Sequence, residues 1–202
     1  MNKVLPIVAL CSAAILTTIL LNGCDKSVSK NAQNPQPYLS TFLSLHNQYC
    51  EKKYDNPESL QNSLDQSPEL APAKDFNGVY EVHVDGISFA VSPEEDGCTT
   101  DVMVQTSDKK ELFSFEDINK ALLNIGYVET GEPVSRKDLG TDQSELSIIE
   151  KKYISPEGEI TILDFPLEKK DKYYMTLFAE KFSEAKRETK EKIIQSLKMA
   201  AR

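Results

Sequence analysis

The segment GVYEVHVDGISFAVSP, at residues 78–93, constrains the fold more than any other stretch of the chain. Its Asp85-Gly86 pair is typical of a two-residue hairpin turn, which fixes the register of the strands on either side. Polar residues, including Glu81 and His83, then lie on one side of the hairpin. The other side carries apolar pairs: Tyr80 with Val91, Val82 with Phe89, and Val84 with Ile87.

Three further segments have the patterns of strands. They are residues 98–106, 146–165 and 173–182. Apolar residues alternate in the first, and the second predicts another hairpin around a turn at 155–158. The third is apolar at both alternating positions, which is typical of a strand in the middle of a sheet. Residues 129–144 are polar and rich in turn-forming residues, so we interpret them as a long loop.

Helical spacing of apolar residues occurs in four places. They are residues 39–50, a short segment after Asn56-Pro57, residues 115–125, and a charged segment from about 183 to the end. Asn56 offers an N-cap and Pro57 a first helical residue. Ser114 and Asp117 form a second start signal of the capping-box type. These positions predict where two of the helices begin.

Strand and helix signals together predict an α+β fold with a single domain at residues 38–202. We expect an antiparallel sheet of about five to six strands, with helices packed mainly on one face. The two hairpins share an SPE sequence and flank a helix, which suggests an internal duplication. Similar turn chemistry explains the likeness more simply.

The N-terminus has the pattern of an export signal. One lysine precedes residues 4–21, which contain no charged side chain. These 18 residues are near the minimum for a membrane-spanning helix, and Pro6 weakens that interpretation. A short basic start, an apolar stretch and small residues at its end favour a secretory signal. An uncleaved anchor and an ordinary signal without lipid are the alternatives.

The segment Leu21-Asn22-Gly23-Cys24 resembles the lipobox of bacterial lipoprotein precursors. The resemblance implies that residues 1–23 are removed and that the Cys24 thiol carries a lipid. The protein would then be anchored in the cell envelope and face the periplasm, with the membrane as one partner. Asp25 resembles a signal for retention at the inner membrane, so we favour the inner membrane over the outer. Residues 24–37 would form the lipidated cysteine and a flexible tether.

The charge of the chain restricts its partners. The formal net charge is −9, whereas a nucleic-acid-binding protein usually carries a basic excess. We therefore expect no nucleic-acid partner. An acidic domain is also repelled by an anionic lipid surface. The tether, with a typical span of about 20 Å, would keep the domain just clear of the headgroups.

Four cysteines are present, and two remain once Cys11 leaves with the signal and Cys24 carries lipid. An oxidising compartment favours a disulfide between Cys50 and Cys98. Its loop of about 49 residues corresponds to ~4 kcal/mol in the chain-entropy model. Two alternatives stay open. His46 with both cysteines could bind zinc, or His46 could serve as the base for a Cys50 nucleophile.

Other candidate groups are sparse. His83 could act as a general base, although a strand histidine on a polar face is usually structural. Asp138, Asp142 and Glu145 have a loose calcium-loop spacing, but Gln143 stands where that loop needs glycine. No standard nucleotide-binding or hydrolase motif occurs.

We therefore expect no catalytic residues, metal or cofactor. The expected function is non-enzymatic binding of an envelope protein, as in an inhibitor, an immunity-type protein or an assembly factor. A small periplasmic hydrolase that uses His83 or His46 is one alternative. A small-ligand carrier is the other.

Overall fold

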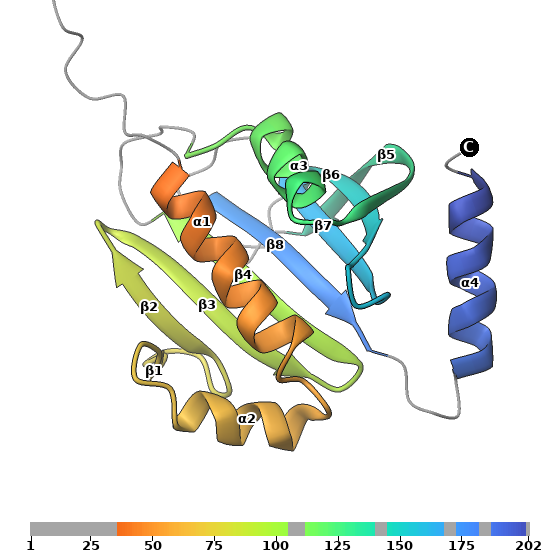
Figure 1. Cartoon of the computed structure of the whole chain (residues 1–202). Helices are drawn as coiled ribbons and strands as arrows, with labels where there is room; N and C mark the ends of the chain where they lie inside the picture. The colour runs from red at the N-terminus through yellow and green to blue at the C-terminus, as the bar shows by residue number, and fades with distance from the viewer. Residues whose placement is uncertain (1–35, 105–111, 140–144, 168–172, 182–186, 201–202) are drawn as a thin grey trace, which may run out of the picture. The chain divides into compact units, whose positions relative to one another are not determined.

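The structure is a computed structural model that describes residues 36–104, 112–139, 145–167, 173–181 and 187–200 (Figure 1). The signal peptide, Cys24, Asp25 and most of the tether lie outside the described residues, as does Asp142. Residues 33–202 form one compact unit.

The described strands form one antiparallel sheet in the order β1-β2-β3-β4-β8-β7-β6-β5. Their bounds are β1 Ala71–Pro72, β2 Tyr80–Val84, β3 Ile87–Glu94, β4 Gly97–Val104, β5 Val128–Leu139, β6 Glu145–Ile154, β7 Ile160–Pro166 and β8 Tyr173–Glu180. The α+β class is confirmed, and the sheet has eight strands where five to six were expected. Strand β8 pairs with both β4 and β7, so the prediction of a central strand is confirmed.

The first hairpin has the predicted register. Strands β2 and β3 pair Tyr80 with Val91, Val82 with Phe89, and Val84 with Ile87. Asp85 and Gly86 both have positive φ angles, 51° and 81°, which a turn of the primed type requires. The local turn chemistry therefore determines this part of the sheet.

The prediction of a loop at 129–144 is wrong for its described part, because β5 covers residues 128–139. Strand β5 is an edge strand and pairs only with β6. Most of its described side chains from Gly131 to Lys137 are exposed, so it lacks the apolar alternation of a buried strand. A register shift between Thr130 and Val134 also interrupts the ladder, as is common at sheet edges. Pairing with β6, rather than local pattern, makes this segment a strand.

The helices are α1 Gln36–Leu45, the π-helix η1 His46–Glu51, α2 Pro57–Asp65, α3 Phe115–Asn124 and α4 Arg187–Ala200. Asn56 and Ser114 are the N-caps of α2 and α3, and each has a complete capping box. Both predicted helix starts are therefore confirmed. None of the helices among the described residues has the length and apolar character to cross a membrane.

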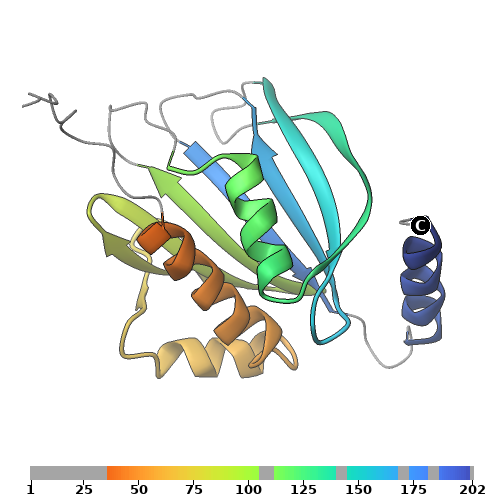
Figure 2. The same cartoon turned by 45° about the horizontal axis from the view of Figure 1, so that its top comes forward.

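Helices α1 and α3 cover the same face of the sheet (Figures 1 and 2). One core joins this face to side chains of α1, α2 and α3. Fully buried members include Phe42, Leu60, Phe89, Leu122 and Leu177. These large side chains fill the interface between the helices and the sheet. We call the opposite side of the sheet the open face.

Candidate functional site

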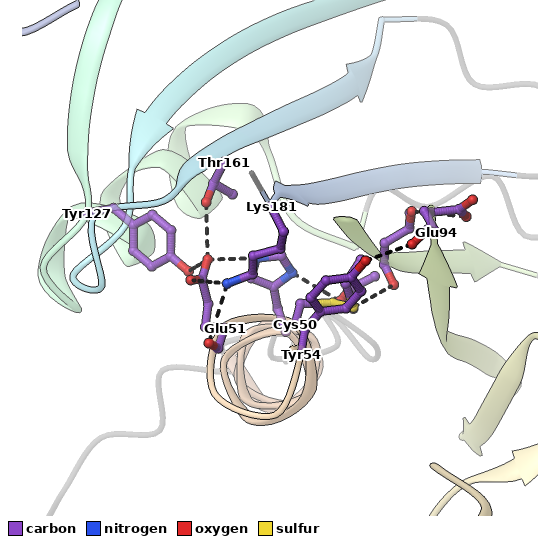
Figure 3. Close-up of a disulfide and its surroundings, with 11 residues drawn as sticks. Cys50, Glu51, Tyr54, Glu94, Tyr127, Thr161 and Lys181 are labelled. Carbon is purple, nitrogen blue, oxygen red and sulfur yellow. Dashed lines mark hydrogen bonds and ion pairs between the residues drawn. A yellow bond between two sulfur atoms is a disulfide. The ribbon is translucent and has the colours of Figure 1, made fainter. Parts of the chain in front are cut away.

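The structure joins Cys50 of η1 to Cys98 of β4 in a disulfide (Figure 3). The two Cα atoms are 5.1 Å apart, which is within the usual range for bridged cysteines. Both cysteines are fully buried. The bond fastens the first helical segment to the sheet, as the thiol count predicted.

His46 lies beside this disulfide and is 1% exposed. Its Nδ1 is 3.0 Å from Thr100 Oγ1, and Thr100 Oγ1 is 3.3 Å from Cys50 Sγ. The Cys50 sulfur has no hydrogen because it belongs to the disulfide, so the Thr100 hydroxyl is the donor in the contact between Thr100 and Cys50. His46 Nε2 faces Glu51 Oε1 at 3.4 Å. Because a carboxylate only accepts, we assign the ring hydrogen to Nε2. Burial lowers the pKa of His46, so the ring is neutral near pH 7.

Glu51 is the centre of a buried polar cluster (Figure 3). Tyr127 Oη and Thr161 Oγ1 each donate to Glu51 Oε1 at 3.1 Å. Lys181 Nζ lies 3.7 Å from Glu51 Oε2 and donates to the Glu51 backbone oxygen at 3.4 Å. Burial raises the pKa of Glu51, but the N–H group of His46 and the positive charge of Lys181 outweigh it. The resulting pKa is about 2.

The π-helix explains why these two groups meet. Its backbone bonds run from residue i to i+5, and His46 and Glu51 are five residues apart. Sequence spacing had placed His46 with Cys50, on the assumption of an α-helix. Nothing in the sequence distinguishes Glu51 from the exposed lysines that follow it. Tyr127, Thr161 and Lys181 were missed for the same reason, since each comes from a distant part of the chain.

The cluster ties four separate parts of the fold together. It joins η1, the residue before β5, strand β7 and the residue after β8. The side chain of Glu51 is fully buried and that of Lys181 is 13% exposed. A substrate would not reach His46 or Glu51 without opening the core. The arrangement is that of a structural ion pair: among the described residues, Glu51 Oε1 accepts two hydrogen bonds, whereas Glu51 Oε2 has the charge of Lys181 nearby but no hydrogen bond.

The two alternatives for His46, a zinc site and a base for a Cys50 nucleophile, both need a free cysteine thiol. Both thiols belong to the disulfide, so Cys50 has no thiolate with which to attack a substrate or bind zinc. Across the ranges that the structure describes, no three His, Cys, Asp or Glu side chains are grouped to hold a metal ion. Of the calcium-loop candidates, Glu145 pairs with Lys137 at 2.6 Å, and the side chain of Asp138 lies outside the described part of the structure.

His83 is on the open face, and 54% of its side chain is exposed. Its Nε2 lies 3.3 Å from Glu81 Oε1, and Ser88 donates to the other oxygen of Glu81 at 2.9 Å. The pair is accessible to solvent. Ser88 is the cross-strand neighbour of His83, and its hydroxyl donates to Glu81 rather than to the imidazole.

The open face has a one-sided charge over strands β2, β3, β4 and β8. These strands contain no lysine or arginine. Their alternation puts all of their acidic residues on the open face: Glu81, Glu94, Asp101 and Glu180. Glu94 is exposed and the other three are half-buried. We call this set the acidic face.

Asp101 lies at the centre of the acidic face. It is opposite Ala90 on one side and Thr176 on the other. Thr176 Oγ1 donates to Asp101 Oδ1 at 2.6 Å. Burial raises the pKa of Asp101 to about 6, and the negative charge of Glu94 adds to the effect. This carboxyl group therefore titrates close to neutral pH.

The chain matches no protein-family model, no curated protein and no solved structure.

Proposed function

We propose that this protein is a lipid-anchored protein of the bacterial envelope that binds a basic protein partner through its acidic face. One observation carries the proposal. Four neighbouring strands hold all of their acidic residues on the face that α1 and α3 leave open, and they hold no lysine or arginine. A partner with lysines and arginines would complement this face.

The physical advantage of such a face is steering and selection. Complementary charge accelerates encounter and disfavours wrong partners by like-charge repulsion. The backbone of β3, β4 and β8 is paired on both edges, so side chains rather than strand addition would contact the partner. The buried cluster around Glu51 and the disulfide link η1 to this sheet, and a sheet ordered before binding reduces the ordering cost of association.

Anchoring rests on the lipobox. Acylation of Cys24 with two or more chains would hold the protein stably in a bilayer, whereas one chain would not. Asp25 favours the inner membrane. The thiols of Cys50 and Cys98 are used within the domain, which leaves Cys24 free for lipid.

Two experiments test the two halves of this proposal. Metabolic labelling with palmitate should mark the wild type and not the Cys24→Ala variant. Affinity capture from crosslinked envelopes should recover a defined partner, and Glu94→Lys should lose it. The matched charge control is Glu58→Lys, at an exposed position of α2, and this variant should retain the partner. Binding through the acidic face is wrong if both variants recover the same partner. The non-enzymatic role is wrong if no partner appears and a substrate panel shows turnover.

A further inference from the structure

A second candidate site lies away from the acidic face, where α2, β1 and the loop before β2 meet. It is a pocket of about 360 Å³. Its lining residues carry no charge: Gln61, Pro72, Ala73, Phe76, Asn77, Gly78, Val79 and Tyr80. We propose that this pocket binds a neutral glycan, with one sugar ring stacked on Phe76.

The loop holds Phe76 outward in a defined turn. Ala73 N donates to Val79 O at 2.8 Å, and Val79 N donates to Phe76 O at 3.4 Å. Gly78 has a φ of 79°, which favours glycine. The Phe76 side chain is left 58% exposed. Full burial of a phenylalanine is worth about 1.5–3 kcal/mol, so a ligand that covers this ring gains from the contact.

The floor of the pocket is polar and fixed. Gln61 Nε2 donates to Tyr80 Oη, which donates to Asp65 Oδ1. Burial and the hydrogen bond to Asp65 raise the pKa of Tyr80 to about 12, so this hydroxyl stays neutral. The Asn77 amide makes no hydrogen bond with any residue that the structure describes. It offers both a donor and an acceptor at the rim.

This combination suits a sugar better than other ligand classes. The face of an aromatic ring is electron-rich, so it attracts the weakly positive C–H groups of a sugar ring. Amide groups can then bond the hydroxyls around that ring. An anionic ligand would find no basic side chain in the lining and a chain of net charge −9. The volume is near the lower end of the range for ligand sites, about 300–1,000 Å³, so the ligand is expected to be small.

A glycan array tests the proposal with the full chain, solubilised in a detergent without a sugar headgroup. We expect binding to at least one neutral oligosaccharide, and little change in high salt because no charge pair is involved. Phe76→Ala should weaken binding at least about tenfold, and Asn77→Ala should weaken it less. Leu123→Ala removes a comparably exposed apolar side chain from α3 and should have no effect.

Three results would overturn the inference. They are no binding to any neutral glycan, equal binding by the Phe76→Ala variant, and capture of proline-rich peptides instead of glycans. Because Phe76 is exposed, its variant should keep the thermal midpoint of the wild type, so loss of binding cannot be ascribed to unfolding. Glu94→Lys should bind glycan normally, which separates this site from the acidic face.

Discussion

His46 Nε2 lies 3.4 Å from Glu51 Oε1, where neither side chain is more than 1% exposed. The contact brings a neutral imidazole to a charged carboxylate that Lys181, Tyr127 and Thr161 also contact. It stands beside the Cys50–Cys98 disulfide. An electrostatic cluster and a disulfide, adjacent to each other, therefore connect η1 to the sheet.

Glu51→Gln should destabilise the domain by about 3 kcal/mol, since it leaves the Lys181 charge without its buried partner. Urea unfolding at pH 7 measures the change. The matched control is Glu58→Gln on the exposed side of α2, which should change stability by less than about 0.5 kcal/mol. Equal effects of the two variants would contradict a structural role for the cluster.

His46→Gln should flatten the pH dependence of stability in mildly acidic solution. Burial lowers the pKa of His46 in the folded state, so the unfolded chain binds more protons as the pH falls below its ordinary value of 6.5. Burial of the neutral His46 ring therefore contributes its full share of the free energy of unfolding above pH 6.5. The wild type loses this share as the pH falls through the lowered pKa of His46 in the folded state. Unfolding curves collected from pH 8 to pH 5 give the difference between variant and wild type. A constant difference across this range would contradict the burial of a neutral ring.

Asp101→Asn should stabilise the domain at pH 8 and have little effect below pH 4. The folded pKa is about 6, against 3.8 for the ordinary group. The folded state therefore binds more protons between these values, and ionisation costs stability as the pH rises through them. An asparagine avoids that cost and can still accept from Thr176. Thermal unfolding at both pH values checks this, with Asp75→Asn in the exposed loop as control. A gain that is the same at both pH values would be inconsistent with titration of Asp101.

Replacing both Cys50 and Cys98 with alanine should cost ~4 kcal/mol, because their sequence separation of 48 closes a long loop in the unfolded chain. Reductant should destabilise the wild type by a similar amount and leave the double variant unchanged. If reductant has no effect on the wild type, the two thiols are not paired in the purified protein.

The features that could be predicted from the sequence are those set by residues close together in the chain. The β2–β3 register follows from Asp85-Gly86, and the start of α3 follows from Ser114 and Asp117. Each depends on residues only a few positions apart. The pairing of Cys50 with Cys98 came instead from counting thiols.

The missed features depend on contacts between distant segments. Strand β5 carries polar residues because it lies at the edge, and only its ladder to β6 defines it. The π-helix brings Glu51 next to His46. The other partners of Glu51 are Tyr127, Thr161 and Lys181, which are 76 to 130 residues away in the sequence. The acidic face was missed because its members are separate in sequence and gather only once β8 inserts beside β4.

The central claim is that the acidic face contacts a protein partner at the membrane. The most direct measurement is photo-crosslinking in living cells from an unnatural amino acid placed at Thr99 or His83, both on the open face. The same probe at exposed Asn62 of α2 serves as the reference. We predict one crosslinked partner from Thr99 and His83 and none from Asn62, with the signal lost in Cys24→Ala. Crosslinks from Asn62 alone, or none from Thr99 and His83, would contradict the claim.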